Sequence, residues 1–129
     1  METLTVDIAN HLLRPDVANL RIKGILYANT LPQFDKAFQA VLAGSKKKMI
    51  FDLSETNYIS SGGWSMLLVC LQRAKEAGGD ILLAGMKPEV HDAFELLEYD
   101  KVMRLFTNAE EALKEGFGTL SSKPAISPA

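Results

Sequence analysis

The feature that most constrains the fold is the alternation, in the middle of the chain, of short apolar runs with segments of helical periodicity. Residues 49–53 and 81–84 are nearly continuous apolar runs, which is typical of strands covered on both faces. Apolar residues recur at helical spacing in 34–42, 64–74 and 90–97, which predicts amphipathic helices. Strands that alternate with helices in this way are joined by right-handed crossovers and lie parallel. The sequence therefore predicts an α/β domain.

The beginning of the chain follows a different pattern. Residues 4–10 alternate apolar and polar side chains, and a second extended run follows at 17–27, so the two runs are predicted to pair as a β-hairpin. Gly24 in the second run indicates a bulge or the close approach of another backbone. A short run at 102–106 and a closing helix at 108–117 complete a mixed, mainly parallel central sheet with about four helices.

Length and charge limit what such a domain can do. The 129 residues fit one globular domain, predicted over 1–117, and residues 118–129 have the composition of a disordered tail. A net charge of -2 argues against a general electrostatic hold on nucleic acid or on an anionic membrane. The chain has neither an apolar run of bilayer length nor the charge order of a secretory signal, and its one cysteine, Cys70, cannot form an internal disulfide. We therefore expect a cytoplasmic, soluble protein.

Signals of catalysis are sparse. His11 and His91 stand alone, no cysteine or histidine pair has metal-ligand spacing, and no nucleotide-binding glycine motif occurs. A hydrolase triad of Ser61, His91 and Asp92 is disfavoured, because the GxSxG elbow is absent and its two partner residues are adjacent in sequence. We predict no catalytic residue, no metal and no cofactor.

The stretch YISSGGWSMLL, from Tyr58 to Leu68, joins a strand to a helix and admits two interpretations. Ser60 and Ser61 suit a helix N-cap, where a hydroxyl oxygen accepts a backbone N–H that the first turn leaves unpaired. The same geometry suits modification, because a phosphate placed there would meet free N–H groups and the positive end of the helix dipole. Gly62 and Gly63 lower helix propensity, which a cap alone does not require, and they allow another backbone or a kinase to come close.

Trp64, one turn past the serines, also admits two interpretations. The helix needs large side chains on its buried face, which favours a place in the core. A position at the rim would instead present the indole as an anchor for a partner.

The residues from Asp52 to Leu68, DLSETNYISSGGWSMLL, resemble the central motif of the STAS family, named for sulfate transporters and anti-sigma factor antagonists. A weaker similarity extends over residues 4 to 115: Gly24-Ile25-Leu26 with Thr30 resembles a G-x-L-D-x-x-T segment, and residues 81–106 resemble the second half of the domain. The chain departs from the pattern at four positions, namely Ser60 for Asp, Gly62 for Ser or Ala, Trp64 for Leu, and Tyr27 for Asp.

The resemblance implies an anti-sigma factor antagonist that acts in a partner switch. The unphosphorylated protein would bind an anti-sigma factor that is also a serine kinase of the histidine-kinase-like ATPase type, and phosphorylation would release it. By position the phosphorylated residue is Ser61, with Ser60 as reserve, and a serine phosphatase would reset the cycle. ATP and metal would belong to the kinase. The implied partner-binding residues are Tyr27, Asn29, Thr30, Ser60, Ser61, Gly62, Gly63 and Trp64.

The resemblance also allows a function of another class. STAS-like subunits occur in stressosome assemblies and with phospholipid ABC transporters, where they bind a partner as a scaffold or accessory without a phosphorylation cycle. Tyr27 at the acidic position and the bulk of Trp64 fit this alternative better than the switch.

Overall fold

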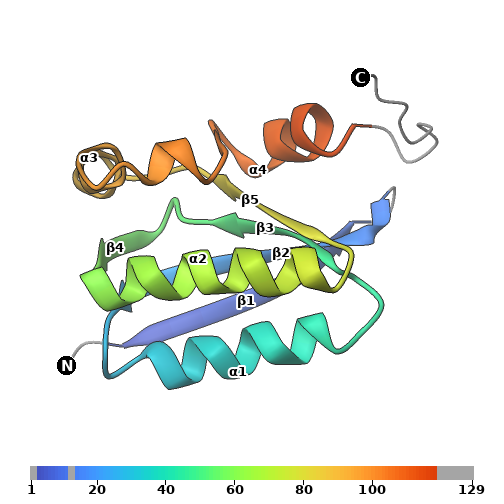
Figure 1. The fold of residues 1–129 in the computed structure, drawn as a ribbon, viewed down its shortest axis with the longest axis horizontal. Coiled ribbons are helices and arrows are strands. Elements are labelled where there is room, and N and C mark those ends of the chain that lie inside the picture. The colour runs from blue at the N-terminus through green and yellow to red at the C-terminus, as the bar shows by residue number, and fades with distance from the viewer. Residues whose placement is uncertain (1–2, 12–13, 119–129) are drawn as a thin grey trace.

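The computed structural model describes residues 3–11 and 14–118, and within them six strands form one sheet (Figure 1). The strand order is β1-β2-β3-β5-β6, with β4 paired to β2. The strands are β1 (Leu4–His11), β2 (Arg14–Leu26), β3 (Lys48–Asp52), β4 (Thr56–Ile59), β5 (Asp80–Ala84) and β6 (Leu105–Phe106). The helices are α1 (Leu31–Leu42), α2 (Ser61–Glu76), α3 (Pro88–Leu96) and α4 (Ala109–Glu111), with a 3-10 turn (Tyr99–Lys101) and a π-helical turn (Ala112–Gly116). The predicted α/β domain with a mixed, mainly parallel sheet is confirmed.

The N-terminal hairpin is also confirmed, because β1 and β2 pair antiparallel while every other strand pair is parallel. Gly24 lies in β2 with a φ of 110°, and a Cβ at this position would collide with the backbone carbonyl of Thr3. The ladder between β2 and β4 changes register just after Gly24. Both expectations for this glycine, a bulge and a close backbone approach, are therefore met at one residue.

The two faces of the sheet are covered by different parts of the chain. Met49 and Phe51 point to the face covered by α1, α2 and α3, whereas Ile50 points to the other face, which the residues around Ala112 cover. Figure 1 shows α1 and α2 running alongside one another, with the α4 segment at the opposite side of the sheet. This double cover explains why the central strands are apolar on both faces.

Residues 51–60 do not form one continuous strand, because β3 ends at Asp52 and β4 begins at Thr56. The backbone turns after Asp52, whose carboxylate accepts hydrogen bonds from the Ser54 N–H at 3.0 Å and the Ser54 hydroxyl at 2.7 Å. Such local bonds from an aspartate side chain compete with the strand ladder and favour a turn. The chain resumes as β4 alongside β2, so the segment that leads into α2 is held by the end of β2.

The closing helix expected at 108–117 is shorter than predicted, because α4 (Ala109–Glu111) passes into the π-helical turn Ala112–Gly116, and the run at 102–106 contributes the short strand β6 (Leu105–Phe106). Asn108 is the N-cap of α4 and accepts a hydrogen bond from the Glu111 N–H at 2.8 Å. The predicted turn near residues 12 and 13 and the predicted tail beyond 118 lie outside the described residues. In the ranges that the structure covers, no helix is both long enough and apolar enough to cross a bilayer.

Candidate functional site

The end of β2 and the start of α2 meet at one corner of the domain. The Ser60 N–H donates a hydrogen bond to the carbonyl of Leu26, the last residue of β2, at 2.9 Å. β4 reaches the same place through its pairing of Ile59 with Leu26. The two serines are therefore placed by a strand pair and not by a free loop. We call residues 27–31 and 58–64 the serine corner.

Ser60 and Ser61 have different environments although they are neighbours. Ser60 is the N-cap of α2, with extended backbone, and its hydroxyl accepts the Gly63 N–H at 3.1 Å. Ser61 is the first helical residue, its side chain is exposed, and its hydroxyl makes no hydrogen bond with the described residues. The cap interpretation thus holds for Ser60, and it leaves the Ser61 hydroxyl accessible from solvent.

The two glycines of the corner also differ. A Cβ on Gly62 would lie 3.7 Å from Leu31 Cδ1, an ordinary contact distance, and the residue is exposed. A Cβ on Gly63 would lie only 2.7 Å from the Leu26 carbonyl oxygen and 2.9 Å from Ile59 Cγ2. The backbone that comes close to Gly63 is therefore that of the chain's own β2. The helix α2 can lie this close to the strand only because residue 63 has no side chain.

The turn from β2 to α1 forms the second half of the corner. The Thr30 hydroxyl donates to the Ile25 carbonyl at 2.7 Å and accepts the Tyr27 N–H at 3.0 Å, while Thr30 itself is 5% exposed. Asn29 donates from Nδ2 to the Tyr27 hydroxyl at 3.2 Å. Thr30 thus holds the turn in place from its buried side, and Tyr27 and Asn29 lie on the solvent-accessible side.

The interpretation of Trp64 as an exposed rim residue was wrong. Its side chain is 1% exposed and packs against Tyr99, with ring centroids 5.3 Å apart, and against Phe94, at 5.9 Å. Its Nε1 is buried without a hydrogen-bond partner among the described residues. The core interpretation is therefore correct, because the first turn of α2 packs against Phe94 of α3 and against Tyr99.

Tyr58 is a corner residue that the sequence pattern does not single out. It lies on β4 with its side chain 56% exposed, next to a cavity of about 190 Å³ between β4 and α3. The short strand offers too few residues for alternation to show which side chains face outward. The cavity is lined by Asn57, Tyr58, Ile59, Trp64, Glu89, Val90 and Ala93.

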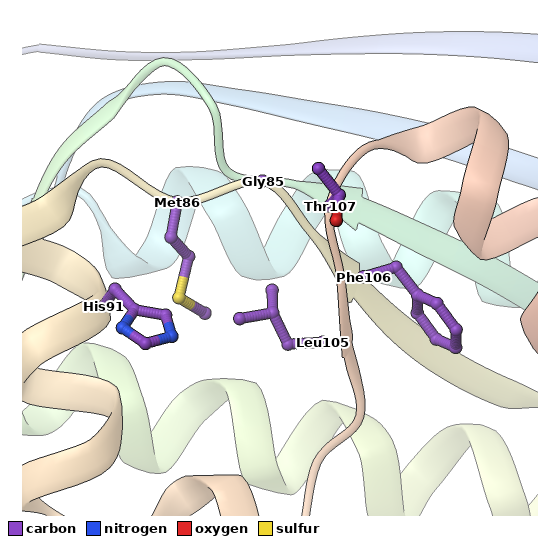
Figure 2. Close-up of a pocket in the computed structure, with 6 residues that line it drawn as sticks. All are labelled: Gly85, Met86, His91, Leu105, Phe106 and Thr107. Carbon is purple, nitrogen blue, oxygen red and sulfur yellow. The ribbon is translucent and has the colours of Figure 1, made fainter.

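The hydrolase arrangement gains no support from the structure. His91 lines a separate cavity of about 300 Å³ where β5 and β6 end, and Figure 2 shows its ring beside the Met86 side chain, with Leu105 next to them. Its Nε2 lies 3.8 Å from the Glu95 carboxylate. Within residues 3–11 and 14–118 no hydrogen bond joins Ser61 to His91, and no group of acidic, histidine or cysteine side chains has the spacing of a metal site.

The serine corner is electrically neutral. Residues 27–31 and 58–64 contain no charged side chain, and the first turn of α2 contains no acidic residue. The backbone N–H groups of that first turn place a partial positive charge at the helix start. A neutral surface with an accessible serine hydroxyl can bind a partner closely, and a phosphate added to that hydroxyl would give the surface a strong negative charge.

Comparisons with known proteins agree with the fold. The family model described as the STAS domain matches residues 11–112. BtrV of Bordetella bronchiseptica, named as a candidate anti-sigma factor antagonist, is 24% identical over 98 residues, which are 76% of this chain and 84% of that protein. An anti-sigma factor antagonist from Mycobacterium paratuberculosis superposes with a TM-score of 0.76 at 22% identity, covering 87% of this chain and 92% of that one.

SpoIIAA, an anti-sigma factor antagonist, is similar in two forms. The unphosphorylated structure has a TM-score of 0.71 at 19% identity, covering 91% of this chain and 100% of that one. The phosphorylated structure, from Bacillus, has a TM-score of 0.65 at 16% identity, covering 87% of this chain and 99% of that one. Because the family model spans most of the chain, the chain belongs to the STAS domain family.

Proposed function

We propose that this protein is an anti-sigma factor antagonist in a partner switch, binding an anti-sigma factor that doubles as a serine kinase and leaving it when Ser61 is phosphorylated. One observation carries the proposal: of two adjacent serines, Ser60 is committed to the helix cap while the Ser61 hydroxyl is exposed and unbonded among the described residues. The names of similar proteins, BtrV and SpoIIAA, support the same class of function.

The neutral corner explains why one phosphate would be enough to switch partners. A phosphoserine adds a charge of about -1.5 to -2, and an interface built around a small neutral hydroxyl would have to desolvate it. A penalty of about 3 kcal/mol weakens binding by roughly a hundredfold, because each 1.4 kcal/mol is a factor of ten. The same phosphate would be tolerated by the folded domain, since it lies at the positive end of α2. Phosphorylation would therefore change the partner and leave the fold intact.

The binding surface follows from the accessible side of the corner. Ser61, Gly62 and Asn29 are exposed, and Ser60 and Tyr27 are partly so. Gly63, Trp64 and Thr30 lie beneath them and hold their positions. We assign the first group to direct contact with the partner and the second to support.

The test uses exposed serines of one helix as matched variants. Ser61→Ala is expected to bind the kinase with or without ATP, and Ser61→Asp to bind weakly. Ser65→Asp, which places the same charge at an exposed position one turn further along α2, is the control and should bind normally. Incubation with candidate kinases and ATP, followed by mass spectrometry, should place the phosphate on Ser61. Equal binding by the Ala and Asp variants at position 61 would refute the switch.

A second candidate function rests on the two family positions where acidic residues are missing. Tyr27 and Ser60 leave the corner without carboxylates, and a stressosome structure shares the fold, with a TM-score of 0.63 at 20% identity. A scaffold or transport accessory would use the same surface without a phosphorylation cycle. It predicts a partner that binds Ser61→Asp and wild type alike and yields no phosphoserine.

A further inference from the structure

The outer edge of β1 is the part of the sheet that the serine corner does not explain. β1 is the first strand in the sheet order, so one of its sides has no neighbouring strand among the described residues. Open strand edges present unpaired N–H and C=O groups and attract a further strand unless charge, proline or a covering segment protects them.

The hydrogen bonds of the hairpin show which residues face this open side. The Ile25 N–H donates to the Thr3 carbonyl, and the Gly24 N–H donates away from β1, to the Glu55 carbonyl. In an antiparallel ladder the bonded pairs alternate. The backbone N–H and C=O groups of odd-numbered residues in β1 therefore bond to β2, and those of even-numbered residues point to the open edge of the sheet. The residues whose backbone groups point to the open edge are Leu4, Val6, Ile8 and Asn10.

The start of this edge is protected and the rest is not. The Leu4 carbonyl accepts a hydrogen bond from Gln33 Nε2 at 2.7 Å, whereas no described residue bonds to the outward groups of Val6, Ile8 or Asn10. The strand contains no proline. Its aspartate, Asp7, is neutralised by Lys23 at 3.0 Å. The usual protections against edge pairing are therefore missing from Val6 to Asn10.

We propose that two copies of this protein associate through β1, antiparallel and centred on Ile8. This register pairs Ile8 with Ile8 and Val6 with Asn10, so it uses every free outward group of the edge. A register centred on Asp7 would set two carboxylates directly opposite one another, which is destabilising. A register centred on Val6 would compete with Gln33 for the Leu4 carbonyl, and the irregularity after Asn10 works against centres further along.

The side chains of the edge fit the same register. Ile8 is 49% exposed, a large apolar side chain that the pairing would bury against its own copy. Beside it lies a cavity of about 200 Å³ whose lining includes Ile8, Asn10 and Val41. Because Asn10 pairs with Val6 of the second copy, that valine would come to the mouth of the cavity. The association thus covers both an apolar side chain and an adjacent hollow.

The dimer would leave the serine corner open. Ile8 is paired with Leu20, six residues before Leu26 on β2, a separation of about 20 Å along the strand. Each copy could bind its own partner, and the proposal does not depend on the function of Ser61.

Cysteine scanning would establish the register. Ile8→Cys should form a disulfide-linked dimer under mild oxidation, because opposed residues of an antiparallel pair have Cα atoms about 5.5 Å apart. Asp7→Cys and Ala9→Cys should link far more slowly, since each faces the other position. The native Cys70 is buried and should not contribute. Linking at position 8 no faster than at 9 would overturn the proposal.

The mass of the uncrosslinked protein provides the second measurement. Sedimentation or light scattering should show that the dimeric fraction of the wild type increases as the protein concentration is raised. Ile8→Lys places like charges opposite one another and should weaken the dimer by about tenfold or more. Ala9→Lys faces Asp7 of the second copy and should preserve the dimer. A wild type that stays monomeric, or equal behaviour of the two lysine variants, would contradict the model, and kinase binding at Ser61 would report separately on the proposed function.

Discussion

Replacing Gly63 by alanine tests how α2 is seated on β2. The new methyl group would lie 2.7 Å from the Leu26 carbonyl oxygen, which also accepts the Ser60 N–H at 2.9 Å, so relief of the clash must disturb that bond. Overpacking of this kind costs about 1–3 kcal/mol. Alanine recovers up to about 1 kcal/mol of helix propensity relative to glycine. We therefore expect Gly63→Ala to lower the free energy of unfolding by about 1 kcal/mol.

Gly62→Ala is the matched control, because it makes the same chemical change one residue earlier. Its methyl group would have 3.7 Å to Leu31 Cδ1 and 3.8 Å to Ser60 Oγ, so only the gain in propensity remains. We expect it to be more stable than wild type by about 0.5 kcal/mol. With a urea m-value of about 1–3 kcal/mol/M for a small domain, the two variants should unfold at midpoints about 1 M apart.

The measurement is urea unfolding followed by circular dichroism, with the emission of Trp64 as a second probe of the same corner. Coincident transitions from the two probes would show two-state unfolding and license the comparison. If Gly63→Ala proves as stable as Gly62→Ala, the close packing of α2 against the Leu26 carbonyl is not what requires glycine, and the reasoning fails.

Three further outcomes are expected. Ser60→Ala should cost about 1 kcal/mol through the lost cap and Ser61→Ala less than about 0.5, as measured by urea midpoints; equal costs would contradict the assignment of the cap. Burial raises the pKa of the Cys70 thiol to about 12, so iodoacetamide should modify it only after unfolding, as read by mass spectrometry. The hydrogen bond from Arg14 lowers the pKa of Asp16, so its contribution to stability is present at neutral pH and lost as the pH falls through that lowered value; Asp16→Asn should reduce the free energy of unfolding at neutral pH and converge with wild type in acid.

Much of the fold is predictable from periodicity, because central strands covered on both faces and helices with one apolar face leave distinct patterns. The hairpin, α1, β3, α2, β5 and α3 follow this logic. β4 does not, since the turn that separates it from β3 depends on the Asp52 carboxylate capturing Ser54, and this local bond leaves no mark on the apolar pattern.

The location of the site is predictable from the sequence, whereas which of its side chains are buried and which are exposed is less so. The motif from Asp52 to Leu68 places the serines at the helix start, as observed. It does not show that Trp64 lies inward or that Tyr58 lies outward, because both depend on how α3 packs against β4. Which of two adjacent serines is the cap likewise depends on where the extended backbone of Ser60 gives way to the helix, and both serines suit that position in the sequence.

The cap on α2 has a consequence for how the repeated serine is read. The Ser60 hydroxyl is hydrogen-bonded within the first turn of the helix, and the hydroxyl of the next residue, Ser61, is exposed. An incoming modifying enzyme would therefore not need to discriminate between them by flanking residues. The structure of the protein would then select Ser61, and removal of the Ser60 hydroxyl would weaken the helix start that holds Ser61 in place.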